Sequence, residues 1–199
     1  MTKRSYKQDC FLARSSDLLT ERWTLLIFRE LLIQPCRFKQ LNTWLAGMGT
    51  NLLAQRLKEL EAAGLIEKQL PEEKRSAYQL TTTGHEVEPV LLSLIRWGFS
   101  NLSPSDDDEY QHHPHWDLLA LKALFNGERC NSSMKIQFES PALTAWVNIS
   151  PEGLRYQFGT IQDADLRIPM TISEFKQSAA AGDYSQQPQM EEFIDCFSA

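Results

Sequence analysis

Residues 49–66, GTNLLAQRLKELEAAGLI, are the stretch from which the fold of this chain can be argued. Their leucines recur at i, i+4 and i+7, which makes one stripe of an α-helix apolar and leaves the opposite stripe polar. These leucines are Leu53, Leu57 and Leu60. Thr50 is placed to cap the N-terminus, and Gly64 can adopt the positive φ that ends a helix. We therefore expect a helix of about 13 residues, close to the usual mean, with one face in a core and the other free to contact a partner.

The segment that follows, residues 65–81 (LIEKQLPEEKRSAYQLT), predicts two short strands around a charged tip. A helix followed by a basic-tipped hairpin is typical of a winged helix, whose exposed polar residues reach base edges in the major groove of DNA. Candidates for DNA contact on the helix are Thr50, Asn51, Gln55 and Lys58, and those at the hairpin tip are Lys74 and Arg75. Taken alone, the two segments also fit a solvated helix with a charge-tipped hairpin.

The flanking residues carry a family resemblance. From Cys10 to Gly98 the chain contains CFLARSSDLLTERWTLLIFRELL, RFKQLNTWLAGMGTNLLAQRLKELEAAGLIEK and YQLTTTG, in that order. This run resembles the HxlR-type winged helix-turn-helix regulators, which are related to the MarR group, and it covers nearly half of the chain. The resemblance implies a homodimeric transcription regulator that binds a pseudo-palindromic operator in double-stranded DNA.

The remaining helices of this half follow from spacing and helix-stop residues. Thr20 is expected to cap a helix that ends before Pro35. Residues 37–47 predict the first helix of the helix-turn-helix, with Arg37 and Lys39 facing the phosphate backbone, although a plain solvated role is equally open for each. Residues 81–102 predict one further helix with more apolar surface than a small core needs. In the resembled family this helix and the first helix build the dimer interface.

Composition indicates a soluble, cytoplasmic chain whose two halves differ in charge. Hydrophobic residues make up 42% of the 199 residues, enough for one or two packed domains. No apolar run of about 18 residues and no apolar segment after the basic start suggests a membrane span or a signal peptide. Residues 1–102 hold 14 Lys and Arg against 11 Asp and Glu, whereas residues 103–199 hold 6 against 15. The basic half contains the helix and hairpin, which suits binding to phosphates at one end.

The cysteines are scattered without a CxxC pair, so neither a disulfide framework nor a zinc site is indicated. They are Cys10, Cys36, Cys130 and Cys196. Cys10 is expected in the first turn of a helix from Asp9 to Leu19, where the helix dipole and the cations Lys7 and Arg14 lower a thiol pKa. In some members of the resembled family a cysteine at the matching position senses oxidants or electrophiles. The alternative for Cys10 is a packing residue.

Composition changes at residues 103–115, which predict a linker between a winged domain, 1–102, and a second domain, 116–199. The linker histidines His112, His113 and His115 are expected to be solvated, and neither a metal nor a cofactor is expected. The second half predicts a helix, a meander of three alternating strands, an extended piece and two helices. The whole chain is therefore expected to be α+β, with an antiparallel sheet in its second domain.

The helix, the meander and the phrase DADLRIPMTISEFKQSAAAG (residues 163–182) resemble the sterol carrier protein fold, which encloses an apolar cavity. The segment after Gly182 departs from that fold, because it is short and lacks a clear second strand pair. Such a cavity would be lined by Phe138, Val147, Tyr156, Phe158, Met170 and Phe175. The alternative is that these residues fill an ordinary core. No catalytic motif is present, so enzymatic activity is not expected.

Two functions remain open at this stage. The first is a dimeric DNA-binding transcription regulator of the HxlR type, and a response to an apolar small molecule through the second domain is left open. The alternative is a carrier or sensor of such a molecule, with the winged domain serving dimerisation or contact with another protein.

Overall fold

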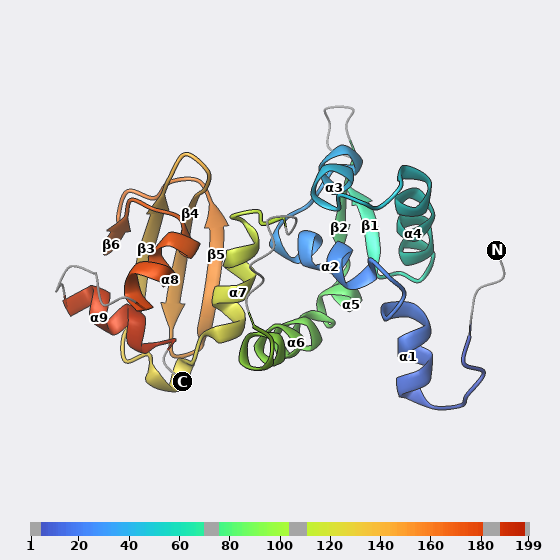
Figure 1. Ribbon diagram of the computed structural model, residues 1–199, viewed down its shortest axis with the longest axis horizontal. Coiled ribbons are helices and arrows are strands. Elements are labelled where there is room, and N and C mark those ends of the chain that lie inside the picture. Colours follow the sequence, from blue (N-terminus) through green and yellow to red (C-terminus); the bar gives the residue numbers. More distant parts are fainter. Residues whose placement is uncertain (1–4, 70–75, 104–110, 181–187, 198–199) are drawn as a thin grey trace. The chain divides into compact units, whose positions relative to one another are not determined.

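The structure is a computed structural model, and it describes residues 5–69, 76–103, 111–180 and 188–197 (Figure 1). The chain forms two compact units, residues 1–91 and 92–199. The linker expected at residues 103–115 lies partly outside the described residues, and its assignment as a domain boundary stays a prediction. No described helix combines the length and apolar character that a bilayer crossing requires.

The first unit has the winged helix-turn-helix order expected from the sequence. Its elements are α1 (Phe11–Leu19), α2 (Thr24–Ile33), α3 (Phe38–Trp44), α4 (Thr50–Ala62), β1 (Ile66–Gln69), β2 (Ala77–Leu80) and α5 (Thr82–His85), and α6 (Glu88–Asn101) follows them. The strands β1 and β2 form an antiparallel hairpin in which Ile66 lies opposite Leu80. The centre of the core is α2, where Ile27 and Phe28 are fully buried.

The helix α4 has the length and the orientation that its leucine spacing predicts. Leu53, Leu57 and Leu60 are buried, and the helix spans 13 residues. Gly64 has a φ of 70°, as expected for the residue that ends the helix. The predicted cap is wrong by one residue. Gly49 is the N-cap, because its extended backbone (φ −64°, ψ 144°) turns its carbonyl to accept the Leu53 N–H at 3.0 Å. Thr50 is the first helical residue.

The start of α2 also differs from the prediction. Thr20 belongs to the end of α1, because its hydroxyl donates to the carbonyl of Ser16 at 2.9 Å. The N-cap of α2 is Trp23, with a left-handed φ of 78°, and α2 begins at Thr24. α1 itself begins at Phe11, so Cys10 is its N-cap residue and does not lie in its first turn. These shifts arise because caps depend on the direction in which the chain enters each helix.

The single helix predicted over residues 81–102 is interrupted between α5 and α6. Thr81 caps α5 with its side chain, and its own hydroxyl donates to the Gly64 carbonyl at 2.7 Å. Its backbone N–H donates to the Leu65 carbonyl at 3.1 Å. Gly84 packs so closely that a Cβ there would lie 2.0 Å from the Leu65 carbonyl oxygen. The short helix is therefore fixed to the junction between α4 and β1.

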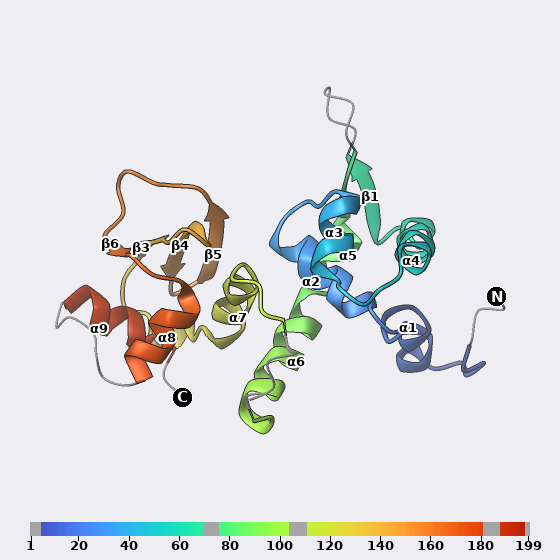
Figure 2. The same ribbon diagram turned by 45° about the horizontal axis from the view of Figure 1, so that its top comes forward.

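The second unit contains a four-stranded sheet with helices on one face (Figure 2). Its elements are α7 (Trp116–Leu124), the 3-10 helix η1 (Gly127–Arg129), β3 (Met134–Glu139), β4 (Thr144–Ser150), β5 (Gly153–Phe158), β6 (Leu166–Ile168), α8 (Ile172–Ala180) and α9 (Pro188–Asp195). The order is β5-β4-β3-β6. The meander β3–β4–β5 is antiparallel, as predicted.

The expectation of an antiparallel sheet holds for β3, β4 and β5, but the sheet as a whole is mixed, because β6 pairs with β3 in the parallel sense. The chain reaches that edge by crossing the face of the sheet opposite the helices. The fully buried side chain of Gln137 supports the crossing: its amide N–H donates to the Gly159 carbonyl at 3.2 Å, and its amide oxygen accepts the Ile161 N–H at 2.8 Å. A continued meander would have added a strand antiparallel to its neighbour, whereas the crossing makes β6 parallel to β3.

Aromatic rings fill the space between the sheet and its helices. Phe138 on β3 lies 6.1 Å from the ring of Phe175 on α8 and 6.2 Å from Phe193 on α9, between ring centroids. The rings of Phe175 and Phe193 are 5.5 Å apart. All three residues are buried, so this part of the second unit is a packed core.

Candidate nucleic-acid interface

The exposed face of α4 carries the polar residues that the sequence analysis assigned to DNA contact. Thr50, Asn51, Gln55 and Lys58 are all exposed, while the leucine stripe faces the core. The stripe fixes the rotation of α4 about its own axis, because turning the helix would expose three leucines. The polar face is therefore held outward on a rigid helix of a width that the major groove of B-DNA admits.

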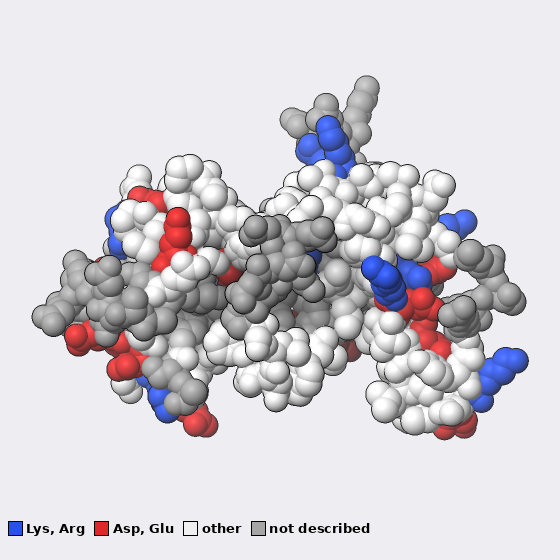
Figure 3. All heavy atoms as spheres, viewed as in Figure 1, with Lys and Arg blue, Asp and Glu red and all other residues white. Residues whose placement is uncertain are grey.

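Basic side chains accompany this face. Arg37 is the N-cap residue of α3, and its backbone N–H donates to the side-chain oxygen of Gln40 at 2.8 Å. The side chains of Arg37 and Lys39 are exposed. Figure 3 shows Lys and Arg side chains near the hairpin and beside α4. Lys74 and Arg75, the candidates at the hairpin tip, lie outside the described residues.

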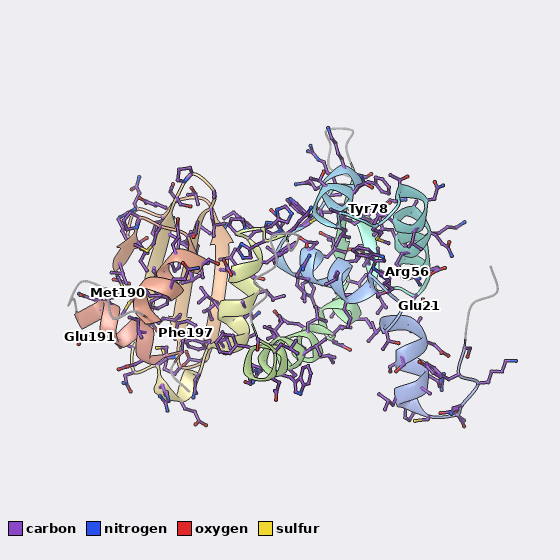
Figure 4. The ribbon with its side chains drawn as sticks, viewed as in Figure 1. Glu21, Arg56, Tyr78, Met190, Glu191 and Phe197 are labelled. Atoms are coloured by element: carbon purple, nitrogen blue, oxygen red, sulfur yellow. The ribbon has the colours of Figure 1, made fainter. Side chains whose placement is uncertain are left out.

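A polar network that the sequence analysis missed connects this face to the rest of the unit. The Gln55 amide donates to Oε1 of Glu59 at 2.8 Å, and Nη1 of Arg56 donates to Oε2 of Glu59 at 2.7 Å. The second terminal nitrogen of Arg56 reaches Glu21, just before α2, at 3.3 Å (Figure 4). The spacings of Gln55 and Arg56 to Glu59 are readable from the sequence, but Glu21 is 35 residues from Arg56.

Two helices carry apolar side chains that the single chain leaves uncovered. No residue of α1 is buried, and Phe11 and Leu12 are 85% and 76% exposed. On α6 the exposed large apolar residues are Val90, Leu94, Trp97 and Phe99. The surface over α6 carries no charge in the view of Figure 3. Exposed apolar side chains gathered along a helix are a feature that many protein–protein contact sites share.

Cys10 is exposed to solvent. Its pKa is lowered from the ordinary value, chiefly because the backbone N–H groups of Ala13 and Leu12, in the first turn of α1, stabilise the thiolate. Cys36, in contrast, is buried, and burial raises the pKa of its thiol to about 12. The structure thus makes Cys10 the more reactive of these two thiols. Its role as a sensor stays a prediction.

We expect iodoacetamide at neutral pH to alkylate Cys10 in the folded protein well before Cys36. A lowered pKa leaves more of the Cys10 thiol as the nucleophilic thiolate, whereas Cys36 is protonated and inaccessible. Peptide mass spectrometry over a time course measures both rates. Unfolding in urea is the control, and it should make the rates similar. Equal rates in the folded protein would contradict the difference.

The six residues predicted to line an apolar cavity do not share one environment. Phe138, Val147 and Phe175 are buried, and Tyr156, Phe158 and Met170 are partly exposed. A hollow of about 480 Å³ in this unit has a largely polar lining that includes none of the six. That lining contains Lys122, Asn148, Ser150, Glu152 and Arg155. The apolar cavity and its ligand stay a prediction.

The three histidines of the expected linker lie close to Trp116 at the start of α7. Nε2 of His112 is 3.3 Å from Oδ2 of Asp117, which also accepts the Ser173 hydroxyl at 2.7 Å. The ring centroid of His113 lies 4.7 Å from that of Trp116. Within the described ranges, no group of three or more His, Cys, Asp or Glu side chains is arranged to hold a metal ion.

Comparison with known proteins identifies the winged helix-turn-helix part of the chain. Residues 18–106 match the HxlR-like helix-turn-helix family. The HTH-type transcriptional regulator sll1512 of Synechocystis is 36% identical over 91 residues, which are 45% of this chain and 67% of sll1512. The HTH-type transcriptional regulator YvaP of Bacillus subtilis is 33% identical over 94 residues, covering 46% of this chain and 87% of YvaP. The HTH-type transcriptional regulator Rv3095 of Mycobacterium tuberculosis is 31% identical over 142 residues, covering 70% of this chain and 82% of Rv3095.

The fold and the exposed polar face of α4 define a winged helix-turn-helix DNA-binding protein. More narrowly, the chain belongs to the HxlR-like helix-turn-helix family. It is a DNA-binding transcription regulator, as the sequence analysis predicted. The resemblance of the second unit to the sterol carrier protein fold is not part of this match and stays a prediction.

Proposed function

We propose that the protein acts as a homodimer that binds a pseudo-palindromic operator, with α4 of each protomer in the major groove of one half-site. The observation that carries the proposal is the polar outer face of α4, held in place by three buried leucines. A two-fold dimer presents two such faces, and its half-sites lie about 34–36 Å apart along the DNA.

The uncovered apolar residues of α1 and α6 support a dimer. Phe11 and Leu12 on α1, and Leu94 and Trp97 on α6, are each at least half exposed in one chain. A second copy of the chain is the occupant that fits a regulator of two-fold operators, because each copy brings the same apolar helices. Size-exclusion chromatography with light scattering tests this state directly.

Different residues serve affinity and sequence preference in this proposal. Asn51, Gln55 and Lys58, with Thr50 at the helix start, face base edges, while Arg37 and Lys39 contact the phosphate backbone. Lys74 and Arg75 at the hairpin tip would contact the neighbouring backbone or minor groove. Selection of bound duplexes from a random pool, repeated at two salt concentrations, tests the proposal. A pool that yields no enriched two-fold sequence and no salt-sensitive binding would overturn it.

Gln55→Ala and Lys39→Gln are expected to separate these two roles. Removing a good bidentate base contact costs roughly 1–3 kcal/mol at the cognate base and relaxes preference at that position. Removing a phosphate contact weakens all sequences alike and reduces the salt slope by about one. Fluorescence anisotropy with the selected duplex and with a scrambled duplex, over a salt series, measures both quantities. Identical effects of the two variants on both duplexes would contradict the division.

A further inference from the structure

We propose that Glu21, Arg56 and Glu59 are positioning residues that fix the orientation of the Gln55 amide and thereby make α4 select adenine at the position that Gln55 reads. This inference rests on the proposed function and deepens it. None of the three positioning residues needs to touch a base. They influence base recognition only through the side chain of Gln55.

The two oxygens of the Glu59 carboxylate have separate partners. Oε1 accepts the Gln55 amide N–H at 2.8 Å, and Oε2 accepts Nη1 of Arg56 at 2.7 Å. Glu59 therefore joins the exposed Gln55 to Arg56, whose side chain is only 13% exposed. The carboxylate cannot turn toward one partner without weakening its bond to the other.

Arg56 anchors this pair to the body of the unit. Its Nη2 lies 3.3 Å from Oε2 of Glu21, in the segment between α1 and α2. Figure 4 shows Glu21 and Arg56 beside each other at the side of α4. The planar guanidinium holds two carboxylates at fixed angles, which the single ammonium group of lysine does not do. The end of the network opposite Gln55 is thus held by Glu21, which lies outside α4.

The chemistry of the carboxylate decides how the Gln55 amide points. An ionised carboxylate only accepts hydrogen bonds, so the NH₂ group of Gln55 must face Glu59 and the amide oxygen must face away. One N–H and the amide oxygen then remain free. These are the donor and the acceptor that a glutamine uses for bidentate contact with N7 and N6 of adenine. The reversed amide would place two acceptors against each other.

Such a network also lowers the conformational entropy that Gln55 loses when the protein binds DNA. A free glutamine side chain loses rotamer freedom when it contacts a base, and a side chain already held loses less. An amide that is free to rotate and turn over presents donor and acceptor in either order, so it tolerates more bases. The fixed amide therefore favours sequence preference more than total affinity.

Glu59→Gln tests the network with little change in shape. A glutamine at this position can donate as well as accept, so it no longer dictates the orientation of the Gln55 amide. It also removes a negative charge close to the DNA, which should strengthen binding to every sequence. The expected result has two opposite parts: tighter binding to a scrambled duplex, and a weaker preference for adenine over the other bases at one half-site position.

The matched control is Glu61→Gln, which removes the same charge from the same helix. The carboxylate of Glu61 pairs instead with Lys68 on β1, at 3.6 Å. It should raise general affinity without changing the adenine preference. Glu21→Gln should weaken the preference for adenine less than Glu59→Gln does, because it weakens only the contact between Glu21 and Arg56. Thermal unfolding of each variant verifies that the fold is retained.

The decisive measurement is a double-mutant cycle between Glu59→Gln and Gln55→Ala, using the selected duplex and one changed at the adenine. The parent protein should prefer adenine by roughly 10-fold or more, and Glu59→Gln should reduce this to about 3-fold or less. In the Gln55→Ala background, Glu59→Gln should change the preference no further. An equal effect in both backgrounds, an unchanged preference, or selection of another base would overturn the inference. Absence of any selected sequence with the parent would instead overturn the proposed function.

Discussion

Trp97→Asp is expected to convert the dimer to a monomer and to lower operator affinity by roughly 100-fold or more. Trp97 is 57% exposed on α6, in a stripe with Val90 and Leu94. A carboxylate placed in a dry interface has no partner for its charge, so the contact between copies becomes unfavourable. A monomer then binds only one half-site and loses the gain from simultaneous attachment of the second recognition helix.

Light scattering after size-exclusion chromatography measures the oligomeric state, and gel-shift titration with the selected duplex measures affinity. Thr83→Asp is the matched control, because Thr83 is an exposed residue of α5 and the same charge is introduced. It should leave the dimer intact and reduce affinity only slightly. If Trp97→Asp remains dimeric at micromolar concentration, α6 does not form the interface.

Leu57→Ala is expected to lower the free energy of unfolding by about 3 kcal/mol, within the 2–5 kcal/mol usual for buried leucines. Leu57 is fully buried in the middle of α4, and its truncation leaves a cavity beneath that helix. Urea denaturation followed by circular dichroism measures the change. Leu52→Ala on the same helix is the control, since Leu52 is 37% exposed and should cost less than about 1 kcal/mol. Equal losses for the two variants would show that α4 is not packed through its leucine stripe.

Local patterns predicted most of the first unit correctly. The spacing of Leu53, Leu57 and Leu60 specified which face of α4 is buried, and Gly64 specified its end. Caps were less predictable. Thr20 and Thr50 are both good capping residues, yet Trp23 and Gly49 occupy those positions. The reason is that the cap is the residue at which the chain turns into the helix, and tertiary packing sets that point. The backbone of Gly49 is extended there, whereas that of Trp23 is left-handed.

Long-range pairings explain the other differences. Alternation in residues 164–172 predicts an extended segment but does not say which neighbour it pairs with, so the parallel contact of β6 with β3 was missed. In the interface, the exposure of Asn51, Gln55 and Lys58 follows from the helix period. The anchoring of Arg56 by Glu21 does not, because only the folded chain brings them together.

The cavity prediction was ambiguous for a physical reason. Large apolar residues such as Phe138 and Phe175 are equally suited to lining an empty space and to filling it. The contacts of both rings with Phe193 depend on where α9 packs. That position could not be deduced from the alternation of residues along the strands.

The close approach of Gly84 to the Leu65 carbonyl joins the backbone of α5 directly to the turn that follows α4. α5 is attached where α4 ends, through Thr81 and the Leu65 carbonyl, and the Val87 N–H continues the chain of bonds by donating to the Gly84 carbonyl at 3.2 Å. Because Gly84 has no side chain, the backbone of α5 lies directly against the Leu65 carbonyl. The residues that lead into α6 are therefore bonded directly to the turn in which α4 ends.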